Sequence, residues 1–302
     1  MEALQLTYGI PSLVLTVFFL KFLCRSEFKY SFYRILQYDL IVNIMCYANT
    51  WFSRFCLWSF STPMMLVVYE NCYFMFVYSA FGMNFYYNMQ SWSVILMSVH
   101  RLSYTKFIRA DEFWKKFSLP IFVFIVFIFV CFNSFTYLYG WFRPKYYDYE
   151  TKIFMSGALD QVKRVVWLQV LNYLSLTYFL VILITSLLTV YFIKTRNINK
   201  SSSGKNRKMM RNLTVISIIN SSIFLMVFIW QSFGKTVLGD ANYFLIMYCL
   251  SDAMTLLLPY ILLAFDGNVR RTLTSIIGRQ AASVAKNLGN SNARTTSTVN
   301  VY

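Results

Sequence analysis

The stretch Phe117–Phe142 reads FSLPIFVFIVFIFVCFNSFTYLYGWF and contains no charged side chain in 26 residues. An α-helix needs about 20 predominantly apolar residues to cross the hydrocarbon core of a bilayer. A strand of a membrane β-barrel would instead be a segment of about 10 residues that alternates in polarity. The stretch therefore predicts a membrane-spanning helix rather than a barrel strand.

Six further apolar runs repeat this pattern along the chain. Of the 302 residues, 58% are hydrophobic and only 13% are charged, whereas a soluble domain carries about 25% charged residues. We therefore predict an all-α membrane protein with a seven-transmembrane helix bundle over residues 1–266. The predicted spans are 3–22, 35–58, 71–100, 117–142, 165–194, 212–234 and 241–265. The short apolar segment Phe55–Tyr69, which Pro63 interrupts, is interpreted as a loop lying on the membrane plus an extension of the third span.

The positions of the basic residues predict the orientation of the bundle. Twenty-one of the 28 Lys and Arg residues fall in the first, third and fifth loops and the tail, and cytoplasmic loops carry such an excess. The N-terminus is therefore predicted outside the cell and the C-terminus inside. Residues 267–285 have one apolar face and predict a short amphipathic helix on the inner membrane surface. Residues 286–302 predict a disordered cytoplasmic tail.

The net charge of +16 could suggest nucleic-acid binding. The basic residues lie beside the apolar runs, as expected for loops that stay next to the anionic leaflet, so we predict no nucleic-acid partner. Cys56 and Cys72 flank one connection and could form a disulfide if that loop faces an oxidising compartment. No group of Cys, His or acidic residues has metal-ligand spacing, so we predict no metal and no cofactor.

Two of the apolar runs each contain one charged residue, Asp39 and Asp252. Ionisable residues inside a membrane are costly and usually functional, which favours a polar core that couples helix movements to signalling. Hydrogen bonds that simply hold the helices together are the alternative. We expect replacement of either aspartate by Ala to impair signalling more than folding. The predicted polar core contains Asp39, Asn43, Asn84, Asn88, Asn220 and Asp252.

The third predicted span ends in His100 and Arg101. Taken alone, the pair could be an interfacial anchor for the helix end. In a seven-span chain with its N-terminus outside, it favours a switch that faces a G protein.

The chain resembles the nematode serpentine chemoreceptors of class gamma over nearly its whole length. The resemblance lies in Tyr8–Ser12, Ala48–Phe52, Asn88–Arg101, Trp114-Lys115, Leu258–Asp266 and Asn268–Arg270. It implies a chemosensory G-protein-coupled receptor in the plasma or ciliary membrane of a sensory cell, with a heterotrimeric G protein and a small-molecule ligand as partners.

The chain departs from rhodopsin-like receptors at several positions. His100 stands where those receptors have an acidic residue before the arginine, and Tyr260 directly follows Pro259 instead of lying three residues after it. The second outer loop contains no cysteine, so their usual bridge to the third span cannot form. Details of their activation switch are therefore not transferred to this chain.

A receptor of this kind would bind its ligand in the outer half of the bundle, which is rich in aromatic residues. Such residues are also enriched at both membrane interfaces, which is the plainer explanation of their positions. A transporter or channel subunit that uses the two aspartates in an ion path is the alternative function. An enzyme is not expected, because no nucleophile and base have suitable spacing. The candidate ligand-pocket residues are Trp51, Tyr86, Tyr87, Trp230, Tyr243 and Tyr248.

Overall fold

The structure, a computed structural model, describes residues 2–107, 109–155, 157, 161–198 and 204–278. These residues are mostly helical, with one hairpin of two short strands. An additional helix covers residues 267–278. The other elements are α1 (Glu2–Leu23), η1 (Ser26–Phe28), α2 (Ser31–Phe55), η2 (Ser59–Ser61), α3 (Thr62–Asn71), α4 (Phe74–Lys106), α5 (Ala110–Leu138), β1 (Tyr146–Asp148), β2 (Ile153–Met155), α6 (Gln161–Ile198), α7 (Gly204–Leu256) and α8 (Leu258–Phe265).

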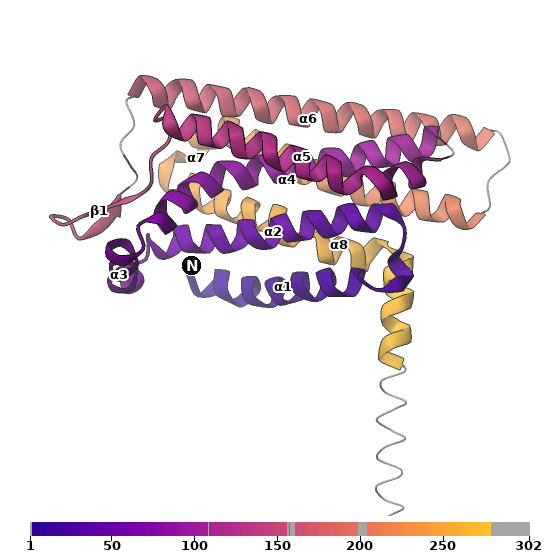
Figure 1. Cartoon of the computed structure of the whole chain (residues 1–302), viewed down its shortest axis with the longest axis horizontal. Helices are drawn as coiled ribbons and strands as arrows, with labels where there is room; N and C mark the ends of the chain where they lie inside the picture. Colours follow the sequence, from indigo (N-terminus) through magenta and orange to yellow (C-terminus); the bar gives the residue numbers. More distant parts are fainter. Residues whose placement is uncertain (1, 108, 156, 158–160, 199–203, 279–302) are drawn as a thin grey trace, which may run out of the picture.

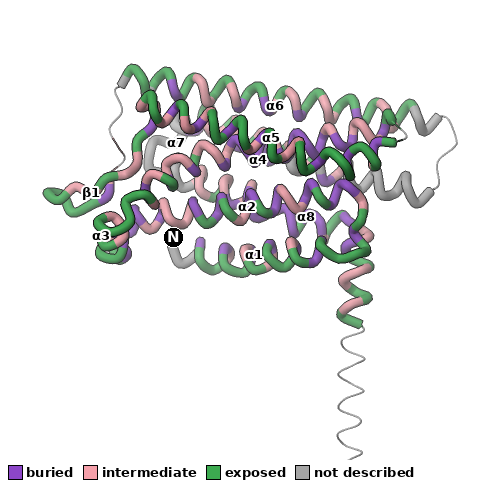
Figure 2. The backbone as a smooth tube through the Cα atoms, in the orientation of Figure 1, coloured by how far each residue is buried: buried purple, intermediate pink, exposed green. Residues whose placement is uncertain are grey.

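The long helices lie side by side in one bundle, and α4 is its central element (Figure 1). Helix α4 packs against α2, α5, α6 and α7, and its residues from Asn88 to Arg101 are almost all buried. The outward faces of α1 and α6 are exposed (Figure 2). Following the predicted orientation, we call the end with Ser31 and Arg101 the inner end, and the end with Arg54 and α3 the outer end.

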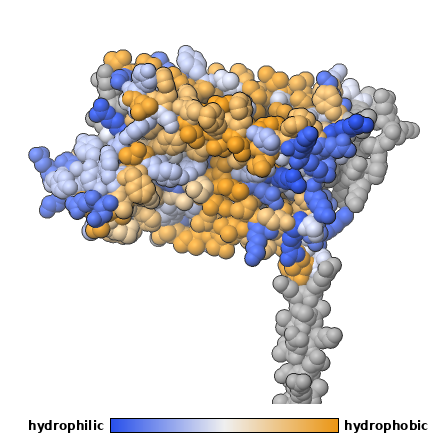
Figure 3. Space-filling model, in the orientation of Figure 1, coloured by the Kyte–Doolittle hydropathy of each residue, from blue (hydrophilic) through white to orange (hydrophobic). Residues whose placement is uncertain are grey.

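The outward faces of the bundle are apolar. Val123, Phe124 and Phe127 of α5 are 55%, 63% and 63% exposed, and contiguous apolar surface of this kind marks a membrane or protein contact. Figure 3 shows an apolar band between two hydrophilic ends. Three described segments are each long and apolar enough to cross a bilayer, and two sharply bent helix pairs raise the number to five: Gln5–Leu23, Ala110–Leu138, Val165–Thr195, Ser59–Asn71 with Phe74–Lys106, and Ile246–Leu256 with Leu258–Phe265. The count of seven spans stays a prediction.

Helix α7 covers the predicted sixth span and most of the seventh. Ile223, Phe224 and Met254 line the same small cavity. In a straight helix, Phe224 and Met254 would be about 45 Å apart. The chain therefore turns back between them, so the two predicted spans lie against each other.

The segment that the sequence predicts as a membrane loop is instead a separate helix. Pro63 lies in the first turn of α3, a position that suits its fixed backbone angle and its missing N–H. Helix α3 meets α4 at an angle of 104°, so it does not extend the third span. The prediction of a loop was wrong for residues 62–69, because apolar residues on both sides of one proline fit a short helix as well as a loop.

A hairpin between α5 and α6 packs against the outer end of the bundle. Phe154 of β2 stacks on Phe76 of α4, with ring centroids 5.4 Å apart, and meets Tyr69 of α3 edge-on. The Lys145 Nζ donates to the backbone oxygen of Ser53 at 2.8 Å. Burial lowers the pKa of this ammonium group, because a charged group loses its water shell there.

The predicted amphipathic helix is present from residue 267 to 278. The Asp266 Oδ1 accepts hydrogen bonds from the N–H groups of Asn268 at 2.8 Å and Val269 at 3.3 Å, which is how an aspartate caps a helix start. The Tyr33 hydroxyl donates to Asp266 Oδ2 at 2.9 Å, so α2 fixes this start. Residues 279–302, including the predicted tail, lie outside the described residues.

Candidate functional site

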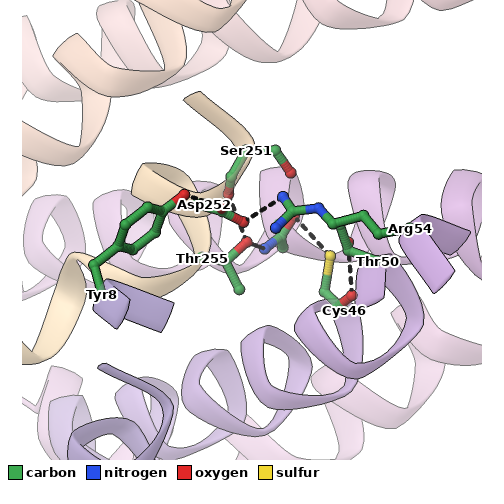
Figure 4. A network of polar contacts seen from close by, with 8 residues as sticks. Tyr8, Cys46, Thr50, Arg54, Ser251, Asp252 and Thr255 are labelled. Atoms are coloured by element: carbon green, nitrogen blue, oxygen red, sulfur yellow. Dashed lines mark hydrogen bonds and ion pairs between the residues drawn. The ribbon is translucent and has the colours of Figure 1, made fainter. Parts of the chain in front are cut away.

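The outer half of the bundle contains a buried ion pair between Arg54 of α2 and Asp252 of α7. The Arg54 Nη2 and Asp252 Oδ1 are 2.8 Å apart, and the side chains are only 2% and 3% exposed. The hydroxyl of Tyr8 in α1 donates to Asp252 Oδ2. Figure 4 shows Tyr8 and Arg54 approaching Asp252 from opposite sides. One carboxylate therefore joins three helices.

Arg54 also lies against two aromatic faces. Its Cζ is 5.4 Å from the Trp51 ring centroid and 5.1 Å from that of Tyr248. Cation–π contacts of this kind are strongest where water is excluded. Trp51 and Tyr248 were predicted as ligand-pocket residues, and the structure brings them together around Arg54.

Sequence reasoning missed Arg54 itself. Arg54 falls within the predicted span 35–58, but it was counted among the basic residues of the outer side and not as a charge inside the bundle. Helix α2 continues to Phe55, which keeps Arg54 inside the bundle. Asp252 has no basic residue in its own predicted span, and a buried carboxylate needs a partner. This need was the signal in the sequence that could have pointed to Arg54.

The other aspartate, Asp39, lies in a separate polar cluster between α2 and α4. Its Oδ2 accepts from Asn43 Nδ2 at 2.9 Å, and its Oδ1 accepts from the Ser93 hydroxyl. The Gln90 Nε2 donates to Asn43 Oδ1 at 2.7 Å and to the Thr255 hydroxyl at 3.2 Å. A cavity of about 10 Å³ adjoins this cluster, close to the minimum volume that holds one water molecule.

The two aspartate clusters are joined through α7. Thr255 lies three residues after Asp252 in the same helix, and its hydroxyl receives the Gln90 hydrogen bond. Cys46 Sγ also donates to Gln90 Oε1, at 3.6 Å. A path of polar side chains therefore runs from the ion pair to Asp39, and the role of the two aspartates in signalling stays a prediction.

His100 and Arg101, which were predicted to face a G protein, are both buried. His100 is 0% and Arg101 is 2% exposed. The Arg101 guanidinium lies over the Phe32 ring, with Cζ 5.1 Å from the centroid. Its Nε and Nη1 atoms have no hydrogen-bond partner among the described residues. A buried cation without an anion is costly, so this conformation stores free energy at the inner end.

His100 belongs to a hydrogen-bonded contact between α2, α4 and α5. The Ser31 hydroxyl donates to Asp111 Oδ1 at 2.7 Å and is 2.8 Å from His100 Nε2. Because the hydroxyl proton is committed to Asp111, the His100 Nε2–H must be the donor in the second contact. Lys115 is ion-paired with the same carboxylate. Nearby, Trp114 Nε1 donates to Ser103 Oγ at 2.7 Å.

Asn88, another predicted polar-core residue, contacts α6. The Tyr178 hydroxyl donates to Asn88 Oδ1 at 2.7 Å, and Asn88 Nδ2 donates to the backbone oxygen of Asn84 at 2.8 Å. Asn88 is fully buried, whereas Asn84 is half-buried. The side chain of Asn220 lies outside what the structure describes.

Two other predicted ligand-pocket residues, Tyr86 and Tyr87, have hydrogen-bond partners outside the Arg54 cluster. The Tyr86 hydroxyl bonds to that of Tyr78, and the Tyr87 hydroxyl is 2.6 Å from Ser175 Oγ. Trp230 is half-buried in α7, and the side chain of Tyr243 lies outside what the structure describes.

The two cysteines of the predicted disulfide are separate thiols in this structure. Cys56 is buried and Cys72 is exposed, on either side of α3. Among the described residues, no group of three or more His, Cys, Asp or Glu side chains could hold a metal ion.

These features define a class of protein. Apolar outer faces and buried polar contacts between helices are typical of multi-pass helical membrane proteins. A family model described as Srg family chemoreceptor matches residues 3–273. The chain therefore belongs to the Srg family of chemoreceptors and is a multi-pass membrane protein.

Two relatives from Caenorhabditis elegans match most of the chain. "Serpentine receptor class gamma-53" is 32% identical over 269 residues, which cover 89% of each chain. "Serpentine receptor class gamma-47" is 27% identical over 288 residues, which cover 88% of each chain. The resemblance drawn from the sequence is confirmed, and the family is one of chemoreceptors rather than of enzymes.

Proposed function

We propose that this chain is a chemosensory G-protein-coupled receptor with seven membrane spans, its N-terminus outside the cell. A small-molecule cue binds in the outer half of the bundle. A heterotrimeric G protein binds at the inner ends of α4, α6 and the first part of α7. The sensory-cell membrane is the proposed location.

The observation that carries this proposal is the polar path from the outer ion pair to Asp39. It includes side chains of four helices, α1, α2, α4 and α7, and all of its contacts except that between Asn43 and Asp39 join two helices. A ligand that changes the position of Asp252 therefore alters contacts that extend toward the inner end. Such a ligand shifts an existing equilibrium between two arrangements, provided that it binds one of them more tightly.

Helix α7 offers a place for the change in shape. Its last described segment, Ile246–Leu256, meets α8 at an angle of 51°, with Pro259 just beyond the bend. Such breaks are common positions for a hinge in membrane helices. Asp252 lies before the bend, and the contact between Tyr33 and Asp266 lies after α8. A change in the bend angle thus links the outer site to the inner surface.

The buried state of Arg101 fits a receptor at rest. The contact among Ser31, His100 and Asp111 holds α2, α4 and α5 together beside it. Opening of this contact exposes the Arg101 guanidinium, whose unpaired donors then find acceptors on a bound G protein. The basic segment from Lys194 to Arg211, which includes undescribed residues, would flank that surface or attract the anionic leaflet.

The test is ligand-evoked G-protein activation in cells that express the receptor at their surface. We expect Arg101→Ala to abolish activation while surface expression is retained, because the variant removes an unpaired buried charge. Arg25→Ala is the matched control, since Arg25 is an exposed arginine near the same end. Normal activation by Arg101→Ala would refute the role of Arg101.

A transporter or channel subunit is the alternative function. Ion current carried by the purified receptor in liposomes, without a G protein, would favour it. The aspartates Asp39 and Asp252 would then line the ion path, and their replacement by Asn would change ion selectivity rather than G-protein activation.

A further inference from the structure

The ion pair between Arg54 and Asp252 uses only part of the hydrogen-bonding capacity of Arg54. A guanidinium group has five N–H donors. The Arg54 Nη2 bonds to Asp252, but Nε and Nη1 are buried and have no hydrogen-bond partner among the described residues. Unsatisfied buried donors are rare and costly, so these atoms point to an occupant that is not part of the chain.

Two neighbouring side chains have the same property. The Trp51 Nε1 and the Tyr47 hydroxyl are also buried. They interact with each other, but neither makes a hydrogen bond of good geometry in the described part of the chain. The Trp51 ring lies against the Arg54 guanidinium, and the Tyr47 and Trp51 ring centroids are 5.9 Å apart. Three consecutive turns of α2 thus carry donors whose hydrogen-bonding capacity is not fully used. We call these residues the donor cluster: Tyr47, Trp51 and Arg54.

Helix α1 covers the donor cluster through a glycine. A Cβ atom on Gly9 would lie 2.0 Å from the Tyr47 Oη and 3.6 Å from the Trp51 Cζ2. Only a residue without a side chain therefore allows α1 to lie this close to α2. Tyr8, the residue before Gly9, donates a hydrogen bond to Asp252. Helix α1 therefore contacts both the donor cluster and the ion pair.

The chemistry of these groups selects the occupant. Arginine and tryptophan nitrogens can only donate hydrogen bonds, so the occupant must offer acceptor oxygens. Asp252 already balances the charge of Arg54, and a second anion would place an uncompensated charge in a buried site. A cation would lie next to the positively charged Arg54 donors and would also be an uncompensated buried charge, so it is disfavoured as well. A neutral oxygen acceptor satisfies the donors without adding charge.

We propose that the donor cluster is the ligand subsite of this receptor and that it binds neutral small molecules with a carbonyl oxygen, such as ketones and esters. The oxygen accepts from Trp51 and Arg54, with Tyr47 as a further donor. The aromatic rings of Trp51 and Tyr248 contact the hydrocarbon part. This inference rests on the proposed ligand-binding function and adds the chemical class of the ligand.

The subsite also places the ligand next to the switch. An oxygen that binds the Nε or Nη1 of Arg54 pulls on the same guanidinium group whose Nη2 is paired with Asp252, and a change in the position of that group shifts the α7 end of the polar path. Binding at the donor cluster therefore favours one arrangement of α7 over another, which is what a ligand must do to shift an equilibrium.

The probes are five unbranched compounds of seven carbon atoms each: 2-heptanone, methyl hexanoate, heptanoate, 2-aminoheptane and heptane. The receptor is purified in detergent, and the shift of its thermal unfolding temperature is measured as a function of compound concentration. We expect 2-heptanone and methyl hexanoate to raise this temperature, and the other three compounds to leave it unchanged. Stabilisation by heptanoate or the amine alone, or by none of the compounds, would overturn the proposed class.

Conservative variants test the location. Trp51→Phe and Tyr47→Phe each remove one donor and keep a ring, so we expect each to weaken ketone binding about 5- to 10-fold, the effect of one neutral hydrogen bond. Trp141→Phe and Tyr38→Phe make the same changes outside the cluster and should bind normally. Unchanged ketone binding in both cluster variants would place the subsite elsewhere.

The binding measurement contains no G protein. It can therefore contradict the proposed ligand subsite without contradicting the proposed receptor function, and the reverse. Ketone binding that depends on Trp51 without any G-protein activation in cells would retain the subsite and overturn the proposed signalling role. Activation by ketones that is insensitive to Trp51→Phe and Tyr47→Phe would retain the receptor and overturn the subsite.

Discussion

Removal of one partner from the buried ion pair should destabilise the receptor far more than removal of both. Breaking a buried pair costs about 3–5 kcal/mol, because it leaves an uncompensated charge in a low-dielectric site, whereas replacing both partners by apolar residues is often neutral. The structure also predicts which single replacement is worse. After Arg54→Leu, Asp252 keeps the Tyr8 hydroxyl as a donor.

After Asp252→Leu, by contrast, Arg54 loses the carboxylate bonded to its Nη2, while its Nε and Nη1 already lack partners. An arginine cannot lose its charge in a protein. We therefore place Arg54→Leu near the lower limit, at about 3 kcal/mol, and Asp252→Leu near the upper limit, at about 5 kcal/mol. The double variant should lie within about 1 kcal/mol of the natural chain. This changes the earlier expectation for Asp252, whose loss should impair folding as well as signalling.

The assay is thermal unfolding of the four purified receptors in one detergent. At about 2 °C per kcal/mol for a chain of this size, the single variants should unfold about 6 °C and about 10 °C below the natural chain. Lys115→Leu, which breaks the partly exposed pair with Asp111, is the control and should cost less than about 1 kcal/mol. Additive losses in the double variant would refute the reasoning, because they would mean that the two charges do not compensate each other.

Three further changes test other contacts. Asp39→Asn keeps the shape of the polar cluster but removes its charge, so we expect surface expression near normal and a ligand response reduced at least about 10-fold; a normal dose–response curve would make Asp39 structural. Gly9→Ala should destabilise the receptor by about 1–3 kcal/mol through overpacking against Tyr47, and Tyr47→Phe should partly rescue the unfolding temperature because the clashing hydroxyl is gone. Ser31→Ala removes the hydroxyl that bonds Asp111, so basal G-protein activation should rise; unchanged basal activity would mean that this contact does not hold the resting state.

Much of the architecture could be predicted from hydropathy alone. Uncharged runs such as Phe117–Phe142 have only one stable conformation in a bilayer, and the helix limits of the first five predicted spans followed within several residues. The limits of the last two did not, because α7 extends from residue 204 to 256. The helix limits were predicted least well where charged residues border an apolar run. Helix α5 begins at Ala110, before the predicted span, because Asp111 and Glu112 suit the positive end of a helix.

The candidate site was harder to predict, because its contacts join residues far apart in the chain. Asp39 and Asn43 are one turn apart, and their contact follows from helical spacing. The pairing of Arg54 with Asp252 bridges 198 positions, which no local pattern encodes. The buried state of Arg101 was also outside the reach of the sequence, since an arginine at a helix end suits an exposed anchor equally well.

The sharp angle between α3 and α4 has a consequence for how the receptor senses its surroundings. Only Cys72 and Tyr73 separate the two helices, so if α4 stands upright in the bilayer, α3 lies almost in its plane. Phe60 beside its start and Met64 and Val67 on it are 67%, 55% and 59% exposed and form one apolar stripe. A tilt of α4 must then move this stripe among the lipid headgroups and do work against the lateral pressure of the outer leaflet. We therefore expect the lateral pressure of the outer leaflet to oppose such a tilt of α4.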